Sequence, residues 1–72
     1  MKVNMKKHTL TACDRITGQC LGFIKSVSYT NQSFKLTQNA CEAKIYSSYD
    51  RIYAEIDDLT FYSGGKLIFL IS

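Results

Sequence analysis

The sequence contains no proline and a single histidine, and no stretch of it is repetitive or low in complexity. Linkers and tails are usually rich in proline or in repetitive segments. Their absence from the sequence predicts a single domain over residues 1–72. Lys2, Lys6 and Lys7 precede no apolar segment of the kind that a secretory signal requires, which predicts a cytoplasmic protein. No apolar run approaches the about 20 residues that cross a membrane, so no membrane partner is expected.

Metal sites and cofactors are not expected, because the three cysteines and the one histidine lack the spacing of a zinc site. Free cysteines are usually small hydrophobes in the interior, and the main prediction for all three is a buried or half-buried side chain. Cys13 and Cys20 flank a predicted hairpin turn and would face each other in one register. A redox-dependent disulfide between them is left open, although cytosolic disulfides are rare.

No catalytic pattern is found in the sequence. A nucleophile pair would have to join His8 to a cysteine, and no glycine-rich oxyanion loop accompanies any of the cysteines. Asp57 and Asp58 are neighbours on a predicted helix and point about 100° apart, so they predict an exposed acidic surface. The segment 63–66, Ser-Gly-Gly-Lys, lacks the spacing of a phosphate-binding loop and precedes a strand. A non-enzymatic protein is therefore expected.

Four strands are predicted. Leu67–Ile71 has no polar face, which predicts an inner strand covered on both sides. Residues 6–14, 20–25 (extending towards Tyr29) and 34–36 have strand composition. Gly18 is expected in the left-handed region, closing a three-residue hairpin loop, and Gly22 is expected at a bulge or a close backbone approach.

Two helices are predicted between the third and fourth strands. Thr37 is expected to cap a short helix over residues 39–43. Ser47 is expected to cap a longer one, with Asp50 completing a capping box, and Gly64 is expected to end it. One apolar stripe follows this second helix at helical spacing. Its residues are Tyr49, Ile52, Tyr53, Ile56 and Leu59.

Together these elements predict a small α+β domain in the order β-β-β-α-α-β, with an antiparallel sheet of about four strands. The amphipathic helix is expected to pack on one face of this sheet. So short a chain cannot easily supply a second covering layer. The other face is therefore expected to be covered by a homodimer or by a docked partner.

The charge is distributed unevenly. Residues 48–60 carry a net charge of −3, because four carboxylates oppose only Arg51, and the remainder carries +6. An acidic helix face is therefore a predicted partner-binding surface, and the five tyrosines are of a type enriched at interfaces. Its residues are Asp50, Glu55, Asp57 and Asp58.

The alternative is a basic sheet face that binds nucleic acid, which the acidic helix would oppose. Its cations are Arg15, Lys25, Lys35 and Lys44, interleaved with Phe23, Tyr29, Phe34 and Tyr46. Most of these aromatic side chains are expected to serve the core.

Residues 34–37, Phe-Lys-Leu-Thr, and residues 42–48, Glu-Ala-Lys-Ile-Tyr-Ser-Ser, lead into the amphipathic helix. This arrangement over residues 34–60 resembles short phage and mobile-element proteins, among them inhibitors of bacterial defence such as anti-CRISPR proteins. The resemblance implies stoichiometric binding that blocks a protein or ribonucleoprotein complex in the host cytoplasm, without chemistry. No functional residue is carried over from it.

Overall fold

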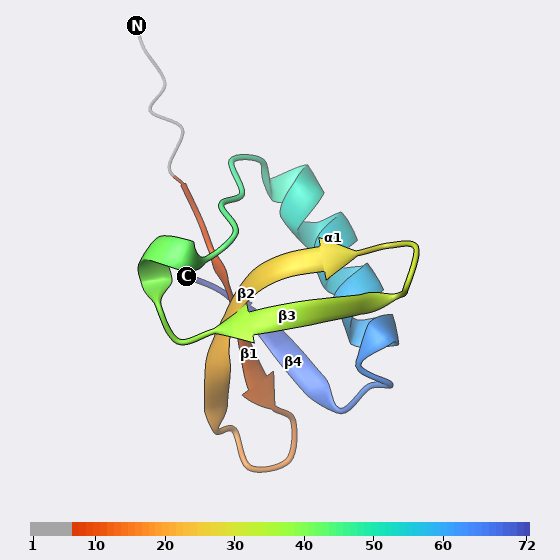
Figure 1. Ribbon diagram of the computed structural model, residues 1–72. Helices are drawn as coiled ribbons and strands as arrows, with labels where there is room; N and C mark the ends of the chain where they lie inside the picture. Colours follow the sequence, from red (N-terminus) through yellow and green to blue (C-terminus); the bar gives the residue numbers. More distant parts are fainter. Residues whose placement is uncertain (1–6) are drawn as a thin grey trace, which may run out of the picture.

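Four strands and one long helix form a two-layer α+β domain in the computed structural model, which describes residues 7–72 (Figure 1). The start of the first predicted strand at residue 6 lies outside this range, as do Lys2 and Lys6, two of the three lysines considered for a secretory signal. The elements are β1 (Leu10–Asp14), β2 (Cys20–Ser28), β3 (Ser33–Thr37), the 3₁₀ helix η1 (Ala40–Glu42), α1 (Tyr49–Tyr62) and β4 (Leu67–Ile71). All neighbouring strands are antiparallel, so the predicted fold class is confirmed.

The strand order in the sheet is β3-β2-β1-β4, which makes β4 an edge strand. The prediction of an inner strand at residues 67–71 is therefore wrong, and the two inner strands are β1 and β2. Only one side of β4 is paired, with β1, through partners such as Thr11 and Leu70. Phe69 faces the core and is 6% exposed, whereas Ile68 and Leu70 are 40% and 49% exposed on the other face. An apolar run shows what a strand can bury, but not how many neighbours it has.

The β1–β2 hairpin turns through a four-residue loop, because the Asp14 amide donates to the Gln19 carbonyl at 2.8 Å. A three-residue loop was expected. Gly18 has the predicted left-handed conformation, with φ of +77°. The Asp14 carboxylate accepts hydrogen bonds from the amides of Thr17 and Ile16 at 2.9 and 2.8 Å. These bonds stabilise the turn and lower the pKa of Asp14.

Gly22 combines the two roles predicted for it. The β1–β2 register shifts between Ala12 and Cys13, so a bulge lies directly beside this glycine. Its φ is +149°, and a Cβ atom there would lie 2.9 Å from the carbonyl oxygen of Thr37. No L-residue with a side chain fits this backbone without displacing β3.

Beyond Phe23, β2 leaves β1. A second irregularity follows Ile24, and from there β2 pairs only with β3. The segment before α1 occupies the place beside β1, since the amides of His8 and Tyr46 each donate to the other's carbonyl at 2.8 Å. Lys44 is anchored to β2 in the same way, through its amide and the Ile24 carbonyl at 2.8 Å. These bonds fix the position from which α1 begins.

Both helices begin one or two residues later than predicted. Ser48, not Ser47, is the N-cap of α1, and its side chain makes no capping hydrogen bond, so the predicted capping box is absent. Asn39, not Thr37, caps η1 by accepting from the Cys41 amide at 2.9 Å. The end of α1 is as predicted at Gly64, where φ is +69°. The Gly64 and Gly65 amides donate to the Phe61 and Thr60 carbonyls at 3.0 Å, a Schellman arrangement.

The core lies between α1 and one face of the sheet. It consists of Leu10, Ala12, Ile24, Tyr46, Ile52, Leu59 and Phe69. From α1, Ile52 and Leu59 are fully buried, as predicted, but Tyr49 and Tyr53 are 55% and 58% exposed. The buried stripe is rotated from the predicted one, and its third buried member is Glu55.

Replacing Gly22 tests the close approach to β3. We expect Gly22→Ala to lower the free energy of unfolding by about 2–3 kcal/mol, through an unfavourable φ and a clash with the Thr37 carbonyl. Gly18→Ala is the matched control, because no atom lies within 4 Å of a Cβ there. It should cost only about 1 kcal/mol, from the left-handed backbone alone. Urea unfolding measures the stability of both variants. Equal losses of stability would show that the contact with the Thr37 carbonyl has no effect.

Candidate functional site

The sheet face opposite α1 carries an exposed apolar surface. Residues that are partners across a ladder share a face, so the register places Phe23, Thr11 and Leu70 in one row. Cys20, Cys13 and Ile68 form the next row. We call Phe23, Ile68, Leu70 and Cys20 the open-face patch; Cys13 lies on the same face of the sheet but is only 1% exposed. The expectation that one helix leaves the second sheet face uncovered agrees with the exposure of Ile68 and Leu70.

The patch continues to the free edge of β4. Edge strands are usually protected by a charge, a proline or a bulge, because their unpaired backbone groups can pair with another chain. Residues 67–71 have none of these, and their register with β1 is regular throughout. The opposite edge strand, β3, carries Lys35 at its centre. The exposure of β4 could not be predicted from the sequence, because five apolar residues in a row indicate burial.

The acidic residues of α1 divide into two groups. Asp50, Asp57 and Asp58 are exposed, as predicted, and the two ion pairs found within residues 7–72 do not involve them. Glu55 does not belong to this surface, because it is only 3% exposed and points into the domain. It lies three residues after Ile52 and four before Leu59, which places it on the buried stripe. That spacing was the one signal in the sequence for its burial.

Glu55 is surrounded by three donors. Its Oε1 atom accepts from Lys44 Nζ at 2.6 Å and from Tyr46 Oη at 2.9 Å, and its Oε2 atom accepts from Tyr29 Oη. The Lys44 ammonium also lies 5.2 Å and 5.8 Å from the ring centroids of Tyr46 and Tyr29. We call Tyr29, Lys44, Tyr46 and Glu55 the Glu55 cluster. Among the described residues, no buried side-chain nitrogen or oxygen lacks a partner.

The contacts of the Glu55 cluster shift the pKa values of Glu55 and of its two tyrosines. Burial raises the pKa of Glu55, but the hydrogen bonds from Lys44, Tyr29 and Tyr46 lower it by more, so its pKa falls below the ordinary value. The hydrogen bond to Glu55 and burial together raise the pKa of Tyr29 to about 12. Burial and the same carboxylate also raise the pKa of Tyr46. At neutral pH the cluster holds one anion, one cation and two neutral phenols, which suits a structural role.

The structure engages three of the four predicted cations in contacts within the chain. Lys44 binds Glu55, Lys25 lies 3.7 Å from the Glu42 carboxylate, and Arg15 Nη1 donates to the Gly65 carbonyl at 3.3 Å. Of the aromatic residues on the proposed basic face, Tyr46 is buried and Phe34 packs edge-on against Phe69 at 5.7 Å. These contacts do not favour a surface for nucleic acid.

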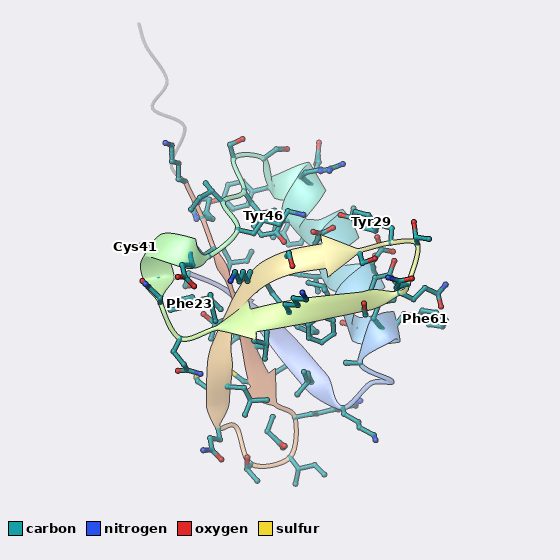
Figure 2. The ribbon with its side chains drawn as sticks, in the orientation of Figure 1. Phe23, Tyr29, Cys41, Tyr46 and Phe61 are labelled. Carbon is teal, nitrogen blue, oxygen red and sulfur yellow. The ribbon has the colours of Figure 1, made fainter. Side chains whose placement is uncertain are left out.

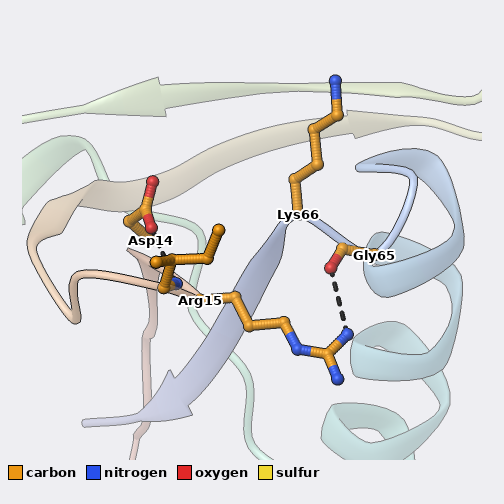
Figure 3. A pocket seen from close by; sticks show the side chains of 5 residues that line it. Asp14, Arg15, Gly65 and Lys66 are labelled. Atoms are coloured by element: carbon orange, nitrogen blue, oxygen red, sulfur yellow. Dashed lines mark hydrogen bonds between the residues drawn. The ribbon is translucent and has the colours of Figure 1, made fainter.

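A hollow of about 450 Å³ lies between the β1–β2 loop and the turn before β4 (Figure 3). It is lined by Asp14, Arg15, Ile16, Gly65 and Lys66. The Asp14 carboxylate is occupied by two backbone amides, and the Arg15 and Lys66 side chains point away from each other in Figure 3. The amides of Gly64 and Gly65 are bonded to α1, so they cannot bind a phosphate. The hollow therefore lacks converging catalytic groups.

Exposed aromatic side chains also lie on α1. Tyr49 stacks between His8 and Tyr53, with ring centroids 5.1 and 6.4 Å apart. Phe61 is 70% exposed, and Figure 2 shows it on the opposite side of the molecule from Phe23. Neither group joins the open-face patch. They provide exposed aromatic residues elsewhere on the surface, which serve as controls below.

Comparison of the chain with protein-family models, with curated proteins and with solved structures gave no match. Within residues 7–72, no group of three or more His, Cys, Asp or Glu side chains is placed to hold a metal ion. No helix in the same part of the chain is long and apolar enough to span a membrane. The open-face patch and the β4 edge are the surface features that a functional proposal has to explain.

Removing the charge of Glu55 tests its structural role. We expect Glu55→Gln to lower the free energy of unfolding at pH 7 by about 2 kcal/mol, because three donors lose an anionic acceptor. Asp58→Asn removes the same charge from the exposed side of α1 and should change stability by less than about 0.5 kcal/mol. Urea unfolding of both variants decides the matter. Similar values for the two would show that the Glu55 cluster is not stabilising.

Protonation of Glu55 at low pH should remove the stability that its carboxylate provides. The pKa of Glu55 is depressed in the folded state, so its stabilisation is present above the unfolded value of about 4.3 and is lost as the pH falls through the folded value. We therefore expect the stability difference between wild type and Glu55→Gln to narrow steadily below about pH 4.3. Urea midpoints measured from pH 7 to pH 3 test this. A difference that stays constant over that range would contradict the assignment.

Proposed function

We propose that this chain is a non-enzymatic protein-binding domain that pairs the free edge of β4 with an extended segment of a partner protein. The observation that carries this proposal is the exposed, uncharged edge strand at residues 67–71. Pairing would supply partners to the outer backbone groups of β4, while side chains of the added strand would pack against Ile68 and Leu70. Strand addition of this kind draws affinity from the backbone and specificity from alternate side chains.

The surroundings of the edge support this mode of binding. Lys66 precedes β4, and no charged side chain lies within the strand itself. The added strand would extend the open-face patch, since Leu70 and Phe23 already share a row with Thr11. Burying apolar area on association gives about 25 cal/mol per Å² before the costs of ordering. An apolar segment of the partner is therefore the ligand chemistry that this surface favours.

A narrower form of the proposal is that the bound protein belongs to a host complex, which the chain blocks as an anti-defence inhibitor. Its support is the resemblance of residues 34–60 to short phage-encoded proteins. The exposed carboxylates Asp50, Asp57 and Asp58 would then contribute a second, electrostatic contact from α1. Such a contact raises the rate of association more than it raises affinity.

The first experiment is capture of binding proteins from bacterial lysate on the immobilised full chain, with elution in salt steps. Leu70→Lys introduces a charge into the open-face patch beside the edge. Tyr53→Lys introduces the same charge on α1, at a site that is 58% exposed compared with 49% for Leu70. We expect a discrete protein to survive moderate salt on wild type and Tyr53→Lys. Leu70→Lys should reduce its capture at least tenfold, since burying an unpaired charge costs more than about 1.4 kcal/mol.

Other outcomes would overturn the proposal. Equal capture by both variants would place the contact away from β4. Recovery of nucleic acid alone, lost as salt rises, would favour the basic residues Arg15, Lys25, Lys35 and Lys44. Light scattering on the purified chain tests whether the β4 edge binds a second copy of the chain instead. A dimer of the wild type that Leu70→Lys converts to monomer would make a second copy the ligand of this edge.

The narrower proposal, in which carboxylates of α1 also contact the bound protein, is tested by association kinetics with the captured protein. Asp50→Asn, Asp57→Asn and Asp58→Asn are combined in one variant, which leaves β4 unchanged. Slower association that becomes equal to wild type at high salt would support a contact through α1. Identical association at low salt would remove the acidic residues from the interface.

A further inference from the structure

Cys13 and Cys20 are direct partners across the β1–β2 ladder, and their sulfur atoms lie 3.1 Å apart. Opposite residues of an antiparallel pair have Cα atoms about 4.5–5.5 Å apart, which falls within the range that disulfides span. The sulfurs would have to approach by only about 1 Å to reach bonding distance. The third cysteine, Cys41, lies in η1 and is exposed.

We propose that Cys13 and Cys20 form a reversible dithiol–disulfide site, oxidised by low-molecular-weight disulfides such as glutathione disulfide. The Cys20 thiolate attacks one sulfur of the small disulfide, forms a mixed disulfide and releases one thiol after protonation. Cys13 then loses its proton to solvent and attacks the Cys20 sulfur. The protein disulfide forms and the second small thiol leaves, so two electrons pass from the protein to the small disulfide.

The order of attack follows from exposure. Cys20 is exposed, whereas Cys13 is only 1% exposed and cannot be reached by a bulky reagent. The hydrogen bond to Cys20 and burial raise the pKa of Cys13, so its thiol stays protonated and unreactive towards solution. Cys20 therefore reacts first and Cys13 resolves the mixed disulfide.

The backbone around Cys13 and Cys20 allows their two sulfur atoms to approach each other. The bulge between Ala12 and Cys13 places Leu21 as an extra residue in β2, immediately beside Cys20. Bulges interrupt regular ladder bonds and permit local bending. A bridge at this position would close the hairpin around its four-residue loop and would lie in the open-face patch next to Ile68.

The test equilibrates the purified full chain, without oxygen, in buffers of stepped reduced-to-oxidised glutathione ratio. Free thiols are then alkylated in denaturant, so that the buried Cys13 is also accessible, and the products are weighed. We expect one two-electron transition in which the chain loses two hydrogens and only Cys41 remains open to alkylation. Arg15 lies between the two cysteines, so trypsin should release residues 8–15 joined to residues 16–25. The oxidised form should melt several degrees above the reduced form.

Three cysteine variants separate the attack by Cys20 from the resolution by Cys13. Cys13→Ser should trap glutathione on Cys20, Cys20→Ser should leave Cys13 unmodified, and Cys41→Ser should keep the wild-type transition. The wild-type measurement stands even if a variant fails to fold. A glutathione adduct on Cys20 that persists in wild type would overturn the proposal. Equal alkylation of all three cysteines across the series, or a bridge between two chains, would also overturn it.

Discussion

The carboxylate of Glu55 joins three segments that are far apart in the chain. Tyr29 follows β2, Lys44 and Tyr46 lie in the connection before α1, and Glu55 itself is at the centre of the helix. A buried carboxylate without partners would cost several kcal/mol, whereas charge-assisted bonds from three donors offset that cost. The position of α1 on the sheet therefore depends on this polar cluster as well as on its apolar stripe. The connection that carries Lys44 is fixed in turn by its bonds to β1 and β2.

The remaining architecture follows from having one helix for a four-stranded sheet. Once α1 is fixed over one face, no second layer within residues 7–72 covers the other. Leu10, Ala12 and Phe69 are buried beneath α1, while Ile68 and Leu70 of the same sheet are solvent-exposed. The apolar residues of β4 thus serve two purposes. Alternate side chains complete the core or form the open-face patch, and the outer edge of the strand is the proposed binding element.

Much of the fold could be predicted from local features of the sequence. Glycines at positions 18, 22 and 64 mark left-handed or crowded backbone, and each has the expected role. The hairpin allowed Cys13 and Cys20 to face each other in one register, and the structure has that register. The order of strands could not be derived, because an apolar run such as residues 67–71 has the same composition at an edge as in the interior.

The candidate site was harder to predict, because contacts between distant segments decide which charged side chains are buried. Asp50, Asp57 and Asp58 are exposed as expected, but the burial of Glu55 depends on donors 9, 11 and 26 residues away in sequence. Lys44 was assigned to a basic surface because its charge was considered without this partner. Local periodicity identifies the helix, whereas the partners of a buried charge are decided by the tertiary fold.

The pairing of β1 with β4 has a consequence for how the domain forms. Thr9 and Ser72 exchange backbone hydrogen bonds across 63 positions of sequence, whereas β1, β2 and β3 form a meander of short connections. Contacts of such long range form slowly, because a large loop must close first. On a ribosome, the meander can assemble while residues 67–71 are still unmade. During that interval β1, which is an inner strand of the finished sheet, is itself an unprotected edge.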